Sequence, residues 1–297
     1  MKPLVIAMPG NESMAGSIAS SLVAEVGSLS WRRFPDGESY VRLESDVSGR
    51  EVILVSSLFR PDEKILPLLF AADAAREFGA RRVILAAPYL GYMRQDHRFK
   101  EGEAVTSRSF AGLLSAHLDG LVTVDPHLHR YKSLSEVYSV PAVAVHATAL
   151  LARWVREHVK NPVIVGPDSE SEQWAREVAS GAEAPVVVLE KTRKGDREVE
   201  IVLPSMGEWR SRVPVLVDDI ISTARTMTKV VELMRAAGAK PPACLGVHAV
   251  FADTAYADLL RTGPLTVITC DTIPHPSNGI KVGPLLSEAL KSLLPQQ

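Results

Sequence analysis

The chain has 297 residues, of which 46% are apolar and 23% are charged, and its formal net charge is −2. This length suits two globular domains of ordinary size, and the small net charge argues against a broad surface for nucleic acid. The chain has only two cysteines, which make no disulfide framework. The first apolar run is too short for a signal peptide, and no run approaches the roughly 18 residues of a membrane span. We therefore expect a cytoplasmic protein.

The first half of the chain alternates short apolar runs with segments of helical spacing. Strands that alternate with helices are typical of βαβ units and a parallel sheet. The expected strands are Leu4–Met8, Trp31–Phe34, Val52–Ser56, Arg82–Ala87 and Leu121–Val124, and the expected helices are Ser13–Val26 and Asp62–Phe78.

A Pro/Gly turn at Phe34–Glu38 places an aromatic ring beside two acids, Asp36 and Glu38. The ring of Phe34 could stack on an adenine, and the acids could accept hydrogen bonds from its exocyclic amine. The pattern alone favours the alternative, a hairpin turn with a packed phenylalanine.

The segment Tyr89–Arg98 follows a strand and carries several cationic side chains, with Arg94, Gln95 and Asp96 in sequence. Ligands of open α/β sheets bind at the carboxyl ends of the strands, and arginine binds phosphate with two parallel hydrogen bonds. The alternative is an exposed basic loop.

The strand Leu121–Val124 ends in Asp125-Pro126-His127. A histidine two residues after a strand-end aspartate is a candidate ligand for a metal or a phosphate, with Asp125 as its support. The alternative is a structural histidine.

The second half continues the alternation. We expect a crossing segment at Val137–Val145, a helix at Ala147–Val159 and strands at Val163–Val165 and Val186–Leu189. Asp168 follows the first of these strands, at the ligand edge. The charged tract after the second strand, residues 190–197, is typical of a solvated hairpin.

The stretch Val213–Met227 combines a strand, two acids and a helix start. An apolar run, Val213–Val217, precedes Asp218 and Asp219, a small polar turn follows, and helical spacing begins near Met227. Amides at a helix N-terminus bind phosphate, whereas carboxylates would repel it and suit sugar hydroxyls or a metal. We therefore expect a sugar phosphate; the alternative is a capped helix after a solvated strand end.

Two segments of the chain echo each other. Ala75–Tyr89 and Met234–Phe251 each run from a helix through Gly-Ala-basic into a strand. Two copies of one α/β domain explain this echo. We also expect a strand at Thr266–Cys270 and a closing helix at Pro284–Leu294.

Five of these segments, in this order, resemble motifs of the ribose-phosphate diphosphokinase (PRPP synthetase) family, and the resemblance covers nearly the whole chain. They are Phe34–Glu38, Tyr89–Arg98, Asp125–His127, Lys191–Arg193 and Val213–Met227. The resemblance implies an α/β fold with two similar domains of type I phosphoribosyltransferase form, each a mainly parallel sheet flanked by helices. We expect domains at 1–145 and 146–282, with 283–297 packing back on the first.

The resemblance also implies roles for individual residues, with Mg²⁺ as the cofactor and ATP and ribose 5-phosphate as substrates. The implied ATP ligands are Phe34, Asp36, Glu38, Arg94, Gln95, Asp96 and His127. The implied ribose 5-phosphate ligands are Asp168, Asp218, Asp219, Ser222, Thr223, Ala224, Arg225 and Thr226. The implied metal ligands are His127 and Asp168, and the implied catalytic cations are Lys191 and Arg193. In the family, the Phe34–Glu38 loop contacts ATP bound by a neighbouring subunit, so we expect a homo-oligomer, at least a dimer.

The expected reaction transfers the diphosphate of Mg-ATP to the C1 hydroxyl of ribose 5-phosphate. Two departures from the family pattern affect the sugar pocket: Arg225 replaces a glycine, and Ser169–Ser171 replace small residues. They motivate one alternative, a non-catalytic regulatory homologue. The other alternative is a phosphoribosyltransferase that consumes phosphoribosyl diphosphate; the paired domains argue against it.

Overall fold

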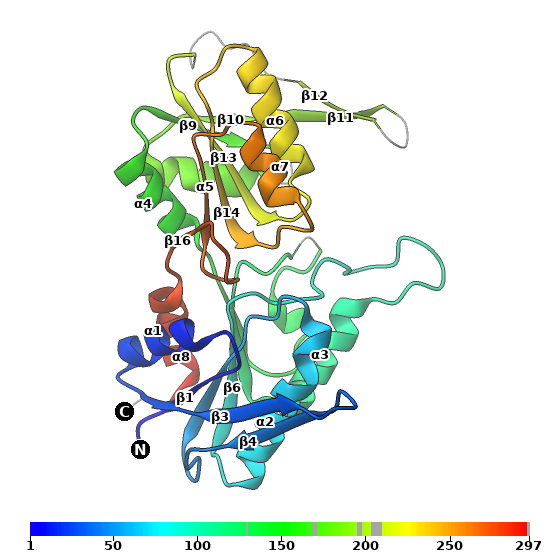
Figure 1. Cartoon of the computed structure of the whole chain (residues 1–297), viewed down its shortest axis with the longest axis vertical. Coiled ribbons are helices and arrows are strands. Elements are labelled where there is room, and N and C mark those ends of the chain that lie inside the picture. The colour runs from blue at the N-terminus through cyan, green and yellow to red at the C-terminus, as the bar shows by residue number, and fades with distance from the viewer. Residues whose placement is uncertain (129, 168–170, 195–197, 203–209, 296–297) are drawn as a thin grey trace. The chain divides into compact units, whose positions relative to one another are not determined.

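The computed structural model describes the chain except for residues 129, 168–170, 195–197, 203–209 and 296–297, and for the strands within 190–202 it describes the backbone alone. The chain divides into two compact units. Unit 1 comprises Met1–Val145 and Val282–Gln297, and unit 2 comprises His146–Lys281 (Figure 1).

Unit 1 is built on a parallel sheet with the strand order β2-β1-β5-β6-β7-β8. The central strands are mostly apolar and almost wholly buried, as expected for strands covered on both faces. The strands are β1 (Leu4–Ala7), β2 (Glu25–Gly27), β5 (Glu51–Val55), β6 (Arg82–Ala87), β7 (Gly120–Val124) and β8 (Ala142–Val145). A separate antiparallel hairpin joins β3 (Leu29–Arg33) to β4 (Ser39–Leu43).

The helices of unit 1 bury one apolar face each. They are α1 (Glu12–Leu22), α2 (Ile65–Glu77), α3 (Thr106–His117) and α8 (Gly283–Leu293), with short 3₁₀ turns η1 (Pro61–Glu63) and η2 (Leu134–Glu136). The closing helix α8 packs on α1, where a Cβ at Gly283 would overlap the side chain of Ser17. Arg82 donates to the carbonyl oxygen of Leu293 at 2.5 Å and ties the end of α8 to β6.

Unit 2 has a second parallel sheet, with the strand order β10-β9-β13-β14-β15-β16. Its strands are β9 (Pro162–Gly166), β10 (Val186–Val188), β13 (Val213–Ile221), β14 (Ala243–Ala249), β15 (Thr266–Cys270) and β16 (Asn278–Ile280). Its helices are α4 (Thr148–His158), α5 (Glu172–Ala182), α6 (Arg225–Ala236) and α7 (Ala255–Arg261). Strands β11 (Glu190–Lys194) and β12 (Glu198–Val202) form an antiparallel ribbon that extends beyond the sheet (Figure 1).

The two units share one topology. In each sheet the second strand of the unit lies at the edge beside the first, and the later strands follow on the other side in chain order. Each unit also inserts its antiparallel hairpin directly after its second strand, β3–β4 in unit 1 and β11–β12 in unit 2. This confirms the expected fold, two similar α/β domains with mainly parallel sheets.

The echo noticed in the sequence marks equivalent places in the two units. Gly79 and Gly238 both adopt positive φ, +85° and +79°, directly after the helices that precede β6 and β14. Ala80 N donates to Ala75 O, and Ala239 N donates to Met234 O, each at 2.9 Å. Both helices therefore end in the same Schellman-type cap, for which glycine is favoured because it lacks a Cβ.

Several element boundaries differ from the sequence expectations. The first helix was expected to reach Val26, but Val23 enters the left-handed region at φ +53° and ends α1, and the edge strand β2 follows. The expected crossing segment contains β8, a half-buried edge strand. The strand expected at Val213–Val217 continues to Ile221 as β13, so the two acids belong to the strand itself. Within the described residues, no helix is both long and apolar enough to cross a bilayer.

We predict that Gly283→Ala lowers the free energy of unfolding by about 1–3 kcal/mol, because the added methyl group overpacks the contact between α8 and α1. The matched control is Gly16→Ala on the exposed side of α1, where a Cβ meets nothing within 4 Å. The control should be neutral or stabilising, since alanine is the better helix former. Urea denaturation of both variants measures the difference, and an undisturbed Gly283→Ala protein would argue against this packing.

Candidate active site

In unit 2, the two acids occupy the carboxyl-terminal part of a central strand. Asp218 and Asp219 are half-buried in β13. The Oδ1 of Asp218 accepts a hydrogen bond from Asp219 N at 3.0 Å, and the Oδ1 of Asp219 accepts one from Ile220 N at 2.7 Å. These backbone donors fix the orientations of the two carboxylates.

The turn after β13 leads directly into the N-terminus of α6. Ala224 adopts the left-handed conformation, φ +54° and ψ +7°, immediately before the helix. Its carbonyl oxygen accepts the first helical hydrogen bond, from Thr228 N at 2.8 Å. Among the described residues, no side chain caps this helix. The amides of the first turn therefore lie before the first helical hydrogen bond, the arrangement that binds anions.

The neighbouring loop after β14 braces this turn. Phe251 N donates to Ile221 O at 2.8 Å, and Ala252 N donates to Ser222 O at 3.1 Å. Within the turn, Thr223 is exposed while Ser222 and Thr226 are half-buried, and Arg225 is exposed as the first residue of α6. A non-glycine residue at positive φ costs about 1–2 kcal/mol, and such strain often lies at ligand-binding turns.

A histidine and two aromatic side chains pack together next to the loop that braces this turn, and no sequence motif predicts the three. The ring of His275 stacks on Phe251 with centroids 4.7 Å apart and meets Tyr256 edge-on, also at 4.7 Å. Burial lowers the pKa of His275. Ser277 N donates to His275 Nδ1 at 3.2 Å, so a neutral ring carries its proton on Nε2. Ring contacts between residues far apart in the chain leave no pattern in the sequence, so no motif could identify this group.

The remaining expected residues of unit 2 are described in part or not at all. Lys191 and Arg193 lie in β11, in register with Ile201 and Val199 of β12. The structure describes only the backbone of these residues. Asp168 is outside the described residues altogether.

In unit 1, the Phe34–Glu38 turn is the exposed tip of the β3–β4 hairpin. Phe34 N donates to Glu38 O at 2.8 Å, and Glu38 N donates to Asp36 Oδ1 at 3.1 Å. The guanidinium of Arg32 lies 4.4 Å from the Phe34 ring centroid and 4.6 Å from that of Tyr40. This cation–π contact fixes the Phe34 ring, and the residue remains 38% exposed.

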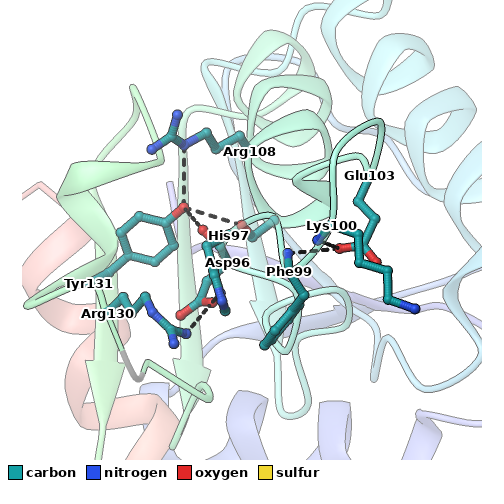
Figure 2. Close-up of polar contacts among 9 residues, drawn as sticks. Asp96, His97, Phe99, Lys100, Glu103, Arg108, Arg130 and Tyr131 are labelled. Atoms are coloured by element: carbon teal, nitrogen blue, oxygen red, sulfur yellow. Dashed lines mark hydrogen bonds and ion pairs between the residues drawn. The ribbon is translucent and has the colours of Figure 1, made fainter.

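The three candidate residues of the basic loop after β6 differ in their exposure to solvent. Arg94 is exposed, Gln95 is half-buried, and Asp96 is only 6% exposed. The Oδ1 of Asp96 accepts hydrogen bonds from His97 Nδ1 at 2.8 Å and Arg130 Nη1 at 2.9 Å (Figure 2). Burial would raise the pKa of Asp96, but these two hydrogen bonds, the charge of Arg130 and a backbone hydrogen bond together hold that pKa below its usual range.

The next strand, β7, ends at the third candidate segment of unit 1. Asp125 is buried at φ +36°, and its amide donates to Val145 O at 2.9 Å. His127 follows and is half-buried. Since β6 and β7 are parallel neighbours, the Arg94–Asp96 and Asp125–His127 segments leave the same edge of the sheet.

Comparison with known proteins identifies one family model for each half of the chain. Residues 4–117 match the family model of the N-terminal domain of ribose phosphate pyrophosphokinase, and residues 133–285 match that of the phosphoribosyl transferase domain. The ribose-phosphate pyrophosphokinase of Methanopyrus kandleri is 36% identical over 98% of this chain and 99% of its own. That of Methanothermobacter thermautotrophicus is 32% identical over 97% of this chain and 100% of its own. The crystal structure of phosphoribosylpyrophosphate synthetase from Mycobacterium smegmatis matches with a TM-score of 0.85 and 27% identity, over 98% of this chain and 99% of that one.

We predict that Asp96→Asn lowers the free energy of unfolding at pH 7 by about 1–3 kcal/mol, the cost of weakening hydrogen bonds to a buried charged group. Because the folded-state pKa of Asp96 is depressed, its charge stabilises the fold above the unfolded-state pKa, about 3.9, and this stabilisation is lost as pH falls through the folded-state pKa. The difference between wild type and variant should therefore shrink below about pH 4.

Chemical denaturation at several pH values measures this difference. The matched control is Glu101→Gln, which removes an exposed acid from the same loop and should change little at any pH. A stability loss that stays constant down to low pH would contradict the role assigned to the charge.

Proposed function

This chain belongs to the ribose-phosphate pyrophosphokinase family, and on that premise we propose which of its residues carry the reaction. The enzyme transfers the β,γ-diphosphate of ATP to the C1 hydroxyl of ribose 5-phosphate. The C1 oxygen attacks the β-phosphorus, the bond from that phosphorus to the α,β-bridging oxygen breaks, AMP leaves, and the hydroxyl proton is released. The products are phosphoribosyl diphosphate and AMP.

Ribose 5-phosphate binds at the end of β13 in unit 2. The observation that carries this assignment is the order along the chain: two carboxylates near the end of β13 are followed directly by the braced turn and the N-terminus of α6. Asp218 and Asp219 accept hydrogen bonds from the 2- and 3-hydroxyls of the ribose. The turn from Ser222 to Thr226 surrounds the 5-phosphate with backbone amides and hydroxyl groups. Asp168 completes the sugar site.

ATP binds through the segments of unit 1 that leave the sheet after β6 and β7. Arg94, Gln95 and His127 hold the phosphate chain, because planar guanidinium and amide donors suit phosphate oxygens. The hairpin tip of Phe34, Asp36 and Glu38 holds the adenine of an ATP bound by a second copy of the chain. That exposed tip, with its ring pinned by Arg32, supports a homo-oligomer of at least two subunits.

Mg²⁺ accompanies ATP in this proposal. Within the described part of the chain, no three His, Cys, Asp or Glu side chains lie close enough to form a metal cage. Mg²⁺ seldom needs one, since it is usually bound through one or two carboxylates, water and substrate phosphates. His127 and Asp168 are the residues that we assign to the Mg-ATP complex. Bound Mg²⁺ neutralises charge on the phosphate oxygens.

Lys191 and Arg193 supply positive charge to the transferred diphosphate. They stand at alternate positions of β11, in the ribbon that extends beyond the sheet (Figure 1). Phosphoryl-type transfer builds charge on the equatorial oxygens, and positioned cations stabilise that charge. This role fits a transferase that needs no covalent intermediate.

We predict that Lys191→Ala lowers kcat by two or more orders of magnitude, about the loss seen on removing one preorganised charge donor. Ribose 5-phosphate should still bind, because its ligands lie on β13 and α6. Steady-state kinetics and calorimetric titration with ribose 5-phosphate separate the two effects. A variant with unchanged kcat would remove Lys191 from the mechanism.

We predict that Arg225→Ala raises KM for ribose 5-phosphate by roughly three- to tenfold, because an exposed cation at the first position of α6 attracts the 5-phosphate. Lys229→Ala, one turn along the same helix and also exposed, is the matched control and should leave KM unchanged. A lower KM in Arg225→Ala would show instead that the arginine crowds the phosphate turn.

A further inference from the structure

Asp96 joins the two segments of unit 1 that carry the proposed phosphate ligands of ATP. We propose that Asp96 is a positioning residue, which fixes the Arg94–Gln95 segment against the segment after β7 and does not itself contact the nucleotide. This inference rests on the proposed function, and it differs from the family resemblance, which implies a direct contact between Asp96 and ATP.

The first support is that the carboxylate of Asp96 is already engaged by protein. Its side chain is 4% exposed and points into the fold, where one oxygen accepts from both His97 and Arg130. Figure 2 shows Arg130 and Tyr131 reaching Asp96 from the neighbouring segment. A buried anion held by two cationic or potentially cationic donors is a poor partner for a polyphosphate, which carries the same sign of charge.

The second support is the hydroxyl group of Tyr131. It donates to the main-chain oxygen of Asp96 at 3.2 Å. A phenol hydroxyl has one proton and can accept further hydrogen bonds, so Ser107 Oγ at 3.3 Å and Arg108 Nε at 3.4 Å are its donors. One oxygen atom thereby connects the start of α3 and the segment after β7 to the backbone of Asp96.

The third support is that the residue before Asp96 is fixed by the same cluster. The main-chain oxygen of Gln95 accepts from Ser107 N at 3.3 Å. Arg130 and Tyr131 follow His127 by three and four residues. The cluster of Asp96, His97, Ser107, Arg108, Arg130 and Tyr131 therefore ties the backbone of Gln95 and Asp96 to a segment that lies three and four residues beyond His127. Networks of this kind make loops rigid when every member is satisfied.

The outer part of the basic loop is held by a different contact, which makes the cluster testable by itself. The carboxylate of Glu103 accepts from Phe99 N at 2.8 Å and Lys100 N at 3.1 Å (Figure 2). In addition, Arg98 Nε donates to Glu103 O at 3.0 Å. Disturbing Asp96 should thus loosen the link to the segment after β7 without opening residues 98–103.

The experiment measures KM for ATP and for ribose 5-phosphate in Asp96→Asn, Tyr131→Phe, Arg130→Gln and the double variant Asp96→Asn/Arg130→Gln. Glu101→Gln is the matched control. We expect Asp96→Asn to raise KM for ATP about tenfold, a coupling of the size found within one hydrogen-bonded network, and Tyr131→Phe to raise it less. KM for ribose 5-phosphate should stay unchanged in all of them. The double variant should have a KM for ATP no higher than that of the single variant with the larger KM.

Three results would overturn the proposal. Equal changes in both KM values would indicate general loss of structure. If the increases in KM for ATP caused by Asp96→Asn and Arg130→Gln multiply in the double variant, the two residues make independent contacts with the nucleotide. If the KM for ATP of Asp96→Asn equals that of Glu101→Gln, Asp96 has no role in ATP binding. If Asp96→Asn fails to fold, Tyr131→Phe decides by the same KM comparison. If the wild-type chain makes no phosphoribosyl diphosphate, the proposed function fails, and the Kd for Mg-ATP of the same variants, measured by calorimetry, still decides the role of Asp96.

Discussion

The convergence of parallel strands on one edge is the constraint on which the rest of this protein depends. In a parallel sheet the strands all end on the same side, so residues far apart in sequence meet there. The acids of β13 and the turn before α6 stand at this edge in unit 2, and the segments after β6 and β7 stand at it in unit 1. Because both sheets have equivalent strand orders, one folding plan provides two such edges, which we assign to a sugar phosphate and to a nucleotide.

Environment decides what each carboxylate at these edges does. Asp218 and Asp219 are half-buried, and backbone amides fix the orientations of their carboxylates. Asp96 is buried against Arg130 and His97, and in our proposal its charge holds two segments together. We therefore assign the same side chain to ligand binding in one unit and to internal bracing in the other, because the donors that surround it differ.

Local patterns predicted much of this fold, and long-range contacts set the limit. The apolar run Arg82–Ala87 is a strand with the expected bounds, because a buried central strand is apolar along its whole length. The edge strand β8 is half-buried, lacks that signal and was missed. The first helix ends early because Val23 adopts the left-handed conformation, which the amino-acid sequence does not predict for a valine. The pairing of Asp96 with Arg130 joins residues 34 apart, so no motif could separate its bracing role from the ligand role implied by its neighbours.

The most direct test of the account is a product assay with Mg-ATP and ribose 5-phosphate. We expect AMP and phosphoribosyl diphosphate in equal amounts, and no AMP when ribose 5-phosphate is omitted, because the β-phosphorus is the proposed site of attack. Formation of ADP would contradict the account, since it would mean transfer of a single phosphoryl group. Binding of ATP without turnover would also contradict it and would favour a regulatory homologue.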